Sequence, residues 1–144
     1  MSKRREGREA AVQYLYQLEV HGDRKADLHA DFWNLRDAKP AVREYANNLI
    51  AGVVAHLDEV DALIKKYLQN FELGRLAAVD RNILRLAIHE MLHCMETPPV
   101  VAINEGIEIA KKFGGEDSGR FVNGILDKVK GELTRPLRTA GVEK

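Results

Sequence analysis

The most distinctive chemical pattern of the chain is His89-Glu90-Met91-Leu92-His93, which matches the motif HExxH. In this motif two histidines one helical turn apart bind zinc, and the glutamate acts as the general base. The apolar residues around it gather on one side of a helix, so His89 and His93 fall on the opposite side. That opposite side also carries Asn82, Arg85 and Glu96. Because a catalytic zinc site needs a cleft and supporting residues, we expect this pair to face water and to bind no metal. A zinc-dependent hydrolase stays an alternative.

Other patterns typical of enzymes do not occur in the sequence. Cys94 is the single cysteine, and the sequence suggests no partner that would activate it as a nucleophile. Glycine-rich phosphate loops, GxSxG elbows and CxxC pairs are missing. We therefore expect a protein that is not an enzyme and needs no cofactor.

A second chemical feature is the basic start of the chain, where Lys3, Arg4, Arg5 and Arg8 are offset by Glu6. Such an arm neutralises phosphates, and a tyrosine further along the same helix offers a ring for stacking on exposed bases. The structural alternative is a solvated helix start, although basic side chains oppose the dipole of a first helical turn. These residues favour nucleic-acid binding through a local patch.

Composition sets the limits for both features. The 144 residues are 45% hydrophobic and carry 22 Lys+Arg against 22 Asp+Glu, which is typical of one soluble domain without a global field for nucleic acid. The single cysteine and the lack of an apolar N-terminal stretch predict a cytoplasmic protein. A membrane-spanning helix needs about 20 apolar residues in a row, and no window approaches that.

The elements that must position these residues are helices, because apolar residues recur every three or four positions and strand signals are nearly absent. We predict an all-α fold with helices at about 5–20, 28–35, 40–71, 80–95, 102–113 and from 117 or 118 onward. The long third helix should kink near Gly52 or Asp58. Asp80 is expected to cap the fourth helix, and Gly114-Gly115 to end the fifth.

The turn-rich stretch 72–79 separates three predicted helices from three others, so the sequence predicts two small packed bundles. We expect them to form a single domain over residues 1–135. The remaining residues, 136–144, are predicted to be a flexible tail.

Several segments resemble the NusB family of bacterial transcription antitermination factors. They are REAAVQYLY at residues 8–16, DRNILRLAIHE at 80–90, VAINEGIEIAK at 101–111 followed by Phe113-Gly114 and Ser118, and FVNGILD at 121–127. The resemblance extends over about nine tenths of the chain, and the segments occur in the order and at the spacing of the family.

The resemblance implies a fold of two packed three-helix bundles without catalytic activity. Family members bind the single-stranded boxA element of ribosomal RNA leaders together with NusE, a protein of the small ribosomal subunit. NusA, NusG and RNA polymerase join the complex, which reads through terminators. Some members associate with themselves, so a homodimer stays open. A helical protein-interaction module without RNA binding ranks third, after the antitermination factor and the hydrolase.

The resemblance also implies roles for single residues. The residues expected to contact RNA are Lys3, Arg4, Arg5, Arg8, Tyr16, Asp117, Arg120 and Phe121. Tyr16 and Asp80 are expected to contact NusE. Two features depart from the family: Glu6 stands where a basic residue is common, and the stretch before Asp80 is less acidic.

Overall fold

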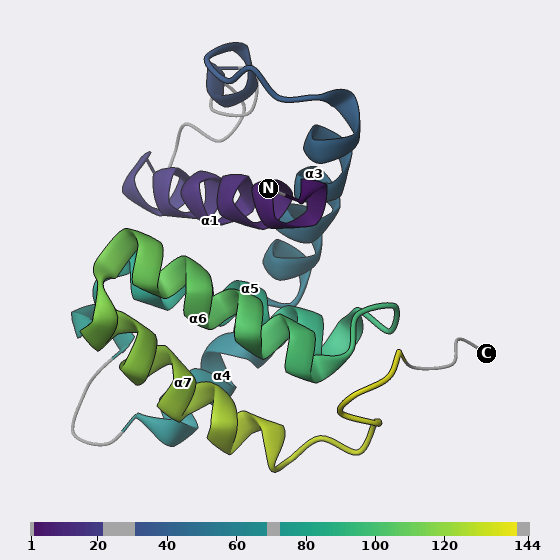
Figure 1. Ribbon diagram of the computed structural model, residues 1–144. Helices are drawn as coiled ribbons and strands as arrows, with labels where there is room; N and C mark the ends of the chain where they lie inside the picture. The colour runs from purple at the N-terminus through teal and green to yellow at the C-terminus, as the bar shows by residue number, and fades with distance from the viewer. Residues whose placement is uncertain (1, 22–30, 69–72, 141–144) are drawn as a thin grey trace.

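The computed structural model describes residues 2–21, 31–68 and 73–140, and all regular elements in these ranges are helical. The all-α prediction is therefore confirmed. In chain order the elements are α1 (Lys3–His21), α3 (Pro40–Ala55), α4 (Leu57–Tyr67), a short 3-10 turn η1 (Leu73–Arg75), α5 (Ala78–His93), α6 (Pro99–Gly114) and α7 (Glu116–Lys130) (Figure 1). No described helix is both long and apolar enough to cross a membrane.

Helix ends follow the proline and glycine positions. Pro40 and Pro99 stand in the first turns of α3 and α6, where a missing backbone N–H costs nothing. Gly115 has φ +89°, which an L side chain rarely adopts, and it separates α6 from α7. The predicted end of this helix at the glycine pair is confirmed.

Two predicted boundaries differ from the structure, and a third predicted helix is described only in part. The break in the long helix falls at His56, between the two expected kink positions, and the helix after it ends at Tyr67. The expected cap at Asp80 is wrong, because α5 already begins at Ala78 and Asp80 lies within its first turn. Of the predicted helix 28–35, residues 31–34 are helical and 28–30 lie outside the described residues.

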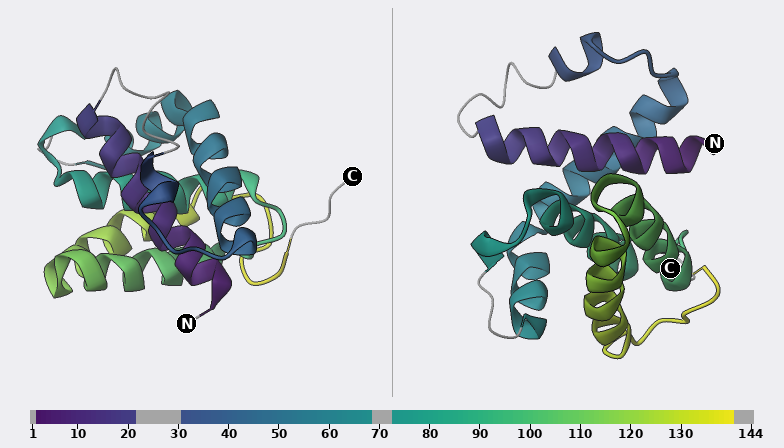
Figure 2. Two further views of the ribbon diagram at one scale, coloured as in Figure 1. Left: turned by 90° about the horizontal axis from the view of Figure 1, so that it is seen from above. Right: turned by 60° about the vertical axis from the view of Figure 1, so that its left-hand side comes forward.

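The helices form two packed groups. Helix α1 packs against α3 on one side and against α5 on the other, while α5, α6 and α7 pack together with α4 (Figures 1 and 2). Two packed helical groups were predicted, but the division falls at His56 rather than at residues 72–79. Helix α4 belongs to the second group because it contacts α5 and α7 more than α3.

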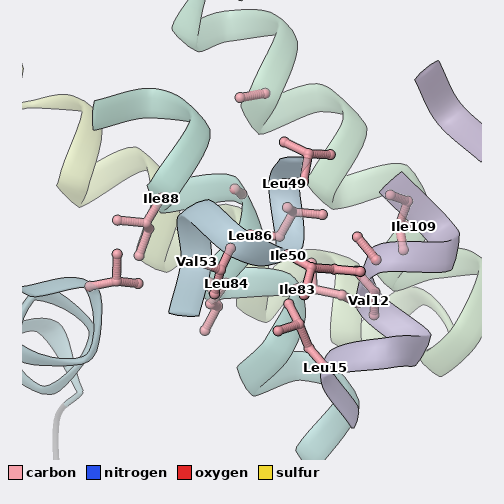
Figure 3. Close-up of a cluster of buried hydrophobic side chains, with 14 of the residues drawn as sticks. Val12, Leu15, Leu49, Ile50, Val53, Ile83, Leu84, Leu86, Ile88 and Ile109 are labelled. Carbon is pink, nitrogen blue, oxygen red and sulfur yellow. The ribbon is translucent and has the colours of Figure 1, made fainter. Parts of the chain in front are cut away.

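Helix α5 is the centre of the molecule. Apolar side chains of α1, α3 and α6 meet it in one continuous core, in which Ile83, Leu84 and Ile88 are 1% exposed or less (Figure 3). From Arg81 to Met91 every residue of α5 except Arg85 is buried. A helix that is covered on all sides must also bury its polar residues, and these need partners.

Candidate nucleic-acid interface

The basic start of the chain forms the first turn of α1. Ser2 closes this turn: its Oγ accepts a hydrogen bond from the backbone N–H of Arg5 at 3.0 Å, and its carbonyl accepts one from Glu6 at 3.0 Å. This cap satisfies an unpaired donor of the helix end and offsets the unfavourable placement of cations there. Lys3 and Arg4 are exposed to solvent, so both charges are accessible to a phosphate.

Arg5 stands at the edge of this exposed turn. Its Nε donates to Oε2 of Glu105 on α6 at 2.5 Å, and its Nη2 pairs with the same oxygen. The side chain of Arg5 is 31% exposed and that of Glu105 is 16% exposed. An anion in solution can therefore reach Arg5, although a carboxylate of the protein already binds it.

Arg8, one turn further, is inside the protein. Its Nε donates to both carboxylate oxygens of Glu90 at 3.0 and 3.1 Å, and its Nη1 donates to Glu105 at 3.3 Å. The hydroxyl of Tyr45 donates to Glu90 at 3.3 Å. Against the effect of burial, these bonds to Glu90 raise the pKa of Arg8, and burial raises the pKa of the Glu90 carboxyl.

The exposure expected for Arg8 is wrong, because this residue is only 2% exposed. The second turn of α1 lies on α5, and there the guanidinium compensates the buried charge of Glu90. On its α3 side, the same turn packs closely against Tyr45. Gly7 allows this contact, since a Cβ at this position would lie 2.6 Å from the Tyr45 ring. Arg8 thus holds the helix whose first turn carries the exposed cations.

Tyr16 lies two turns beyond Arg8, and its side chain is 40% exposed. It lines a groove of about 310 Å³ between α1, α5 and α6 together with Phe113 and Val79. Beside it, Nζ of Lys112 donates to Glu9 at 2.7 Å, which ties the end of α6 to α1. The two aromatic side chains and the cation beside them suit a stacked, negatively charged ligand.

The remaining predicted residues gather at the start of α7. Asp117 and Arg120 are exposed and form an ion pair with each other. Phe121 is half-buried and lines a second groove, of about 250 Å³, against Tyr67 of α4. Asp80 of α5 is half-buried beside the α6–α7 turn, where its Oδ2 accepts a hydrogen bond from Ser118 at 3.4 Å.

The predicted residues therefore occupy three places rather than one. The exposed cations stand at the beginning of α1, Tyr16 stands in the groove beside the end of α6, and the third group follows at the start of α7. Ion pairs from Arg5 to Glu105 and from Glu9 to Lys112 join α1 to α6 along this path.

The HExxH side chains have different neighbours and different exposure. His89 is 5% exposed, so its predicted place on the water side is wrong, while His93 is exposed. Glu90 points to Arg8 and α1, whereas both histidines stack on His56 at the break between α3 and α4. The presumed general base is thus buried and bound by Arg8, away from the cluster of histidine rings.

Burial and neighbouring groups keep the ring of His89 uncharged. Burial first, and then His93 and His56, lower the pKa of His89 to about 4, so its ring is neutral at physiological pH. Nε2 of His93 lies 2.5 Å from a carboxylate oxygen of Glu59. Among the described residues no group of three histidine, cysteine or acidic side chains is arranged to hold a metal.

Asn82 was also expected on the water side and is 1% exposed. Its Nδ2 donates to the carbonyl of Ala78 at 2.8 Å, and its Oδ1 accepts from Arg85 at 3.1 Å. Both errors have one cause, which is that α3 and α4 cover the side of α5 that the helical wheel assigned to solvent.

Sequence reasoning missed the acidic partners, Glu90 and Glu105. A signal for the first was available: Glu90 lies one turn from Ala87 and next to Met91, on the apolar side of the helix. A carboxylate at a buried position requires a cation, and the basic start of the chain supplies one. Nothing comparable marks Glu105, which reaches Arg5 across 100 residues.

Comparison with known sequences identifies the family. The model of the NusB family matches residues 5–130. The transcription antitermination protein NusB of Myxococcus xanthus is 42% identical over 142 residues, covering 94% of this chain and 100% of that protein. The NusB protein of Desulfotalea psychrophila is 44% identical over 136 residues, covering 90% and 96%.

Solved structures agree with the sequences. NusB of T. maritima superimposes with a TM-score of 0.78 at 41% identity and covers 92% of both chains. A chain in a crystal structure of antitermination factors NusB and NusE in complex with dsRNA gives a TM-score of 0.79 at 30% identity, covering 92% of this chain and 99% of that one. Because sequence and fold agree over nearly the whole length, the chain belongs to the NusB family.

Proposed function

We propose that the protein is an RNA-binding transcription antitermination factor that binds single-stranded boxA-like RNA together with a NusE protein. Its relatives are antitermination proteins by name, and one similar chain was crystallised with NusE and RNA. The observation that carries the proposal is the exposed basic first turn of α1, from which a path leads to the Tyr16 groove. Phosphates bind at Lys3, Arg4 and Arg5, and a base stacks at Tyr16.

The other predicted contacts have different parts in this proposal. Asp117, Arg120 and Phe121 border the RNA at the start of α7. Tyr16 and Asp80 face NusE. Two exposed cations and the partly exposed Arg5, on a chain of zero net charge, bind RNA weakly alone, so the affinity rises when NusE joins. Arg8 positions α1 and does not touch the RNA. In the cytoplasm the pair joins NusA, NusG and RNA polymerase, and a homodimer is an alternative assembly of the free protein.

The RNA proposal is tested by fluorescence anisotropy with a labelled boxA-like RNA at several salt concentrations, with and without NusE. Neutralising three phosphates on a single strand predicts a log–log slope of about −2. Arg4→Ala should weaken binding and reduce the slope at an unchanged melting temperature, since the residue is exposed. A flat salt response, or no gain with NusE, would contradict the proposal.

The partner surface is tested with Asp80→Lys and isothermal calorimetry against NusE. Reversing a charge in the first turn of α5 costs about 1 kcal/mol of stability, whereas a like-charge contact at a desolvated interface costs several kcal/mol of affinity. Glu116→Lys makes the same reversal in the first turn of α7 and is the control. Equal NusE affinities of the two variants would limit Asp80 to its role at the helix start.

A further inference from the structure

We propose that Glu105 competes with RNA for Arg5, so that the protein limits its own affinity for phosphate until the RNA displaces this carboxylate. The inference rests on the proposed RNA binding and assigns to Glu105 a role in setting its strength. It concerns one ion pair between α1 and α6, at the edge of the exposed basic turn.

The geometry of the pair makes the carboxylate and a phosphate compete for one edge of the guanidinium. Nε and Nη2 of Arg5 both bind Oε2 of Glu105, so the carboxylate occupies the side edge of the guanidinium. A phosphate uses the same type of edge for two parallel hydrogen bonds. RNA therefore meets an Arg5 whose charge is already compensated and whose side edge is already occupied by a carboxylate of the protein.

The surrounding charges single out Glu105 as the competitor. Glu90 is 1% exposed and is held by Arg8, and Glu9 binds Lys112 on the other side of the path. Among the acidic residues of this network, Glu105 is the one that binds a cation of the exposed turn. Its charge also lies close to any phosphate that approaches Arg5, and repels it.

Exchange is feasible because Glu105 has a second cation. Nη1 of Arg8 donates to its other oxygen, Oε1, at 3.3 Å. When Arg5 turns to a phosphate, the partly buried carboxylate keeps this partner and is not left as an uncompensated charge. The side chain of Arg5 is 31% exposed, so a phosphate in solution can reach it.

The experiment compares Glu105→Gln with Glu108→Gln in the same anisotropy titration with labelled boxA-like RNA. Glu108 lies one turn further along α6, pairs with Lys111 at 3.6 Å and is exposed. Its substitution by glutamine therefore removes the same charge as Glu105→Gln but leaves the Arg5–Glu105 pair in place. We expect Glu105→Gln to bind about fivefold more tightly than Glu108→Gln, the gain that corresponds to freeing one partly exposed ion pair. The salt slopes of the two variants should be similar, because Arg5 contacts one phosphate in both.

A second arm repeats both substitutions in an Arg5→Ala background, where the gain of Glu105→Gln should disappear. Glu105→Asp keeps the charge on a shorter side chain, so it should bind RNA with an affinity between those of the wild type and Glu105→Gln. If the glutamine variant does not fold, the aspartate variant is tested in its place. Equal or weaker binding by a folded Glu105→Gln variant, relative to Glu108→Gln, would overturn the inference while wild-type binding leaves the proposed function intact. If the wild-type protein binds no RNA even with NusE, both fail.

Discussion

The two sides of helix α5 keep polar groups inside the protein in different ways. Glu90 faces α1 and keeps its charge in the interior because Arg8 binds both of its oxygens. His89, the preceding residue, faces the break between α3 and α4, where burial keeps its ring neutral. On one side a cation compensates the buried charge of Glu90, and on the other side burial keeps His89 uncharged. The protein should therefore lose stability on one side when Glu90 loses its partner Arg8, and on the other side when acid protonates His89.

Packing around His89 explains why the neutral form is retained. The ring lies directly on Gly52 of α3, and His56 stacks on both histidines of α5, with ring centres 5.4 Å from His89 and 3.8 Å from His93. Nδ1 of His89 has no hydrogen-bond partner within the described part of the chain. A proton taken up by His89 would place a buried charge next to the two other rings without a direct carboxylate partner.

The largest effect is expected for Arg8→Ala, which leaves the charge of Glu90 buried and unpaired. We expect the free energy of unfolding to fall by about 3–5 kcal/mol, measured by urea denaturation. Arg5→Ala is the control and should cost less than about 1 kcal/mol, because its ion pair is partly exposed. The double variant Arg8→Met with Glu90→Leu should recover much of the loss, and failure to recover any would show that the pair does more than compensate charge.

Lowering the pH should destabilise the protein through His89, on the opposite side of α5. The folded protein holds His89 neutral down to about pH 4, whereas the unfolded chain takes up this proton near pH 6.5, so stability falls as the pH falls through this window. The contribution is up to about 3 kcal/mol. The free energy of unfolding is measured at pH 7.5 and at pH 5 for the wild type and for His89→Gln. The wild type should lose more stability between these pH values, and the excess is the contribution of His89. The neighbouring groups His56, His93, Glu59 and Glu96 are present in both proteins, so their effects cancel. Parallel pH profiles would exclude His89 as the cause.

Gly52→Ala tests how tightly the His89 side is packed. The new Cβ would collide with Nε2 of His89, and overpacking of this kind costs about 1–3 kcal/mol, of which better helix propensity returns up to about 1 kcal/mol. Gly124→Ala, in α7 and open to solvent, receives the propensity gain alone and should be slightly stabilised. Melting temperatures that rise in both variants would mean that the ring moves aside freely.

The smallest effect concerns zinc. Because Arg8 binds Glu90 and His89 is buried, we expect zinc or a chelator to leave the melting temperature of the untagged protein unchanged, and elemental analysis to find far less than one zinc per chain. One zinc per chain, with peptidase activity that Glu90→Gln abolishes, would restore the hydrolase.

Much of the fold followed from local sequence. The 3.6-residue period predicted helices at every described α-helix, and the glycine pair at 114–115 correctly marked the end of α6. Prediction failed at helix ends that lack such a marker, as at Ala78, where an extended Ala77 precedes the helix without a side-chain cap. The resemblance to the NusB family was read from the same local segments and is confirmed.

The candidate site was predictable only in part. Lys3 and Arg4 are exposed as expected, and the charge pattern alone sufficed for them because the end of a helix is open to water. Whether Asp117, Arg120 and Phe121 contact RNA stays a prediction. Arg8 could not be separated from Arg5 by sequence, since the two differ by one helical turn and not in type.

The sequence by itself determined the helices, their glycine and proline boundaries and the family, because each depends on residues close together in the chain. Only the tertiary structure decided which charged side chains are accessible to a ligand and which are buried or paired within the protein. A helical wheel divides one helix into an apolar and a polar side, but α5 is enclosed by α1, α3, α4, α6 and α7 and has no water side along most of its length. Burial of Arg8, Asn82 and His89, and the hold of Glu105 on Arg5, depend on helices far apart in the sequence. Desolvation and pairing across those contacts, rather than residue type, set the chemistry that each side chain retains.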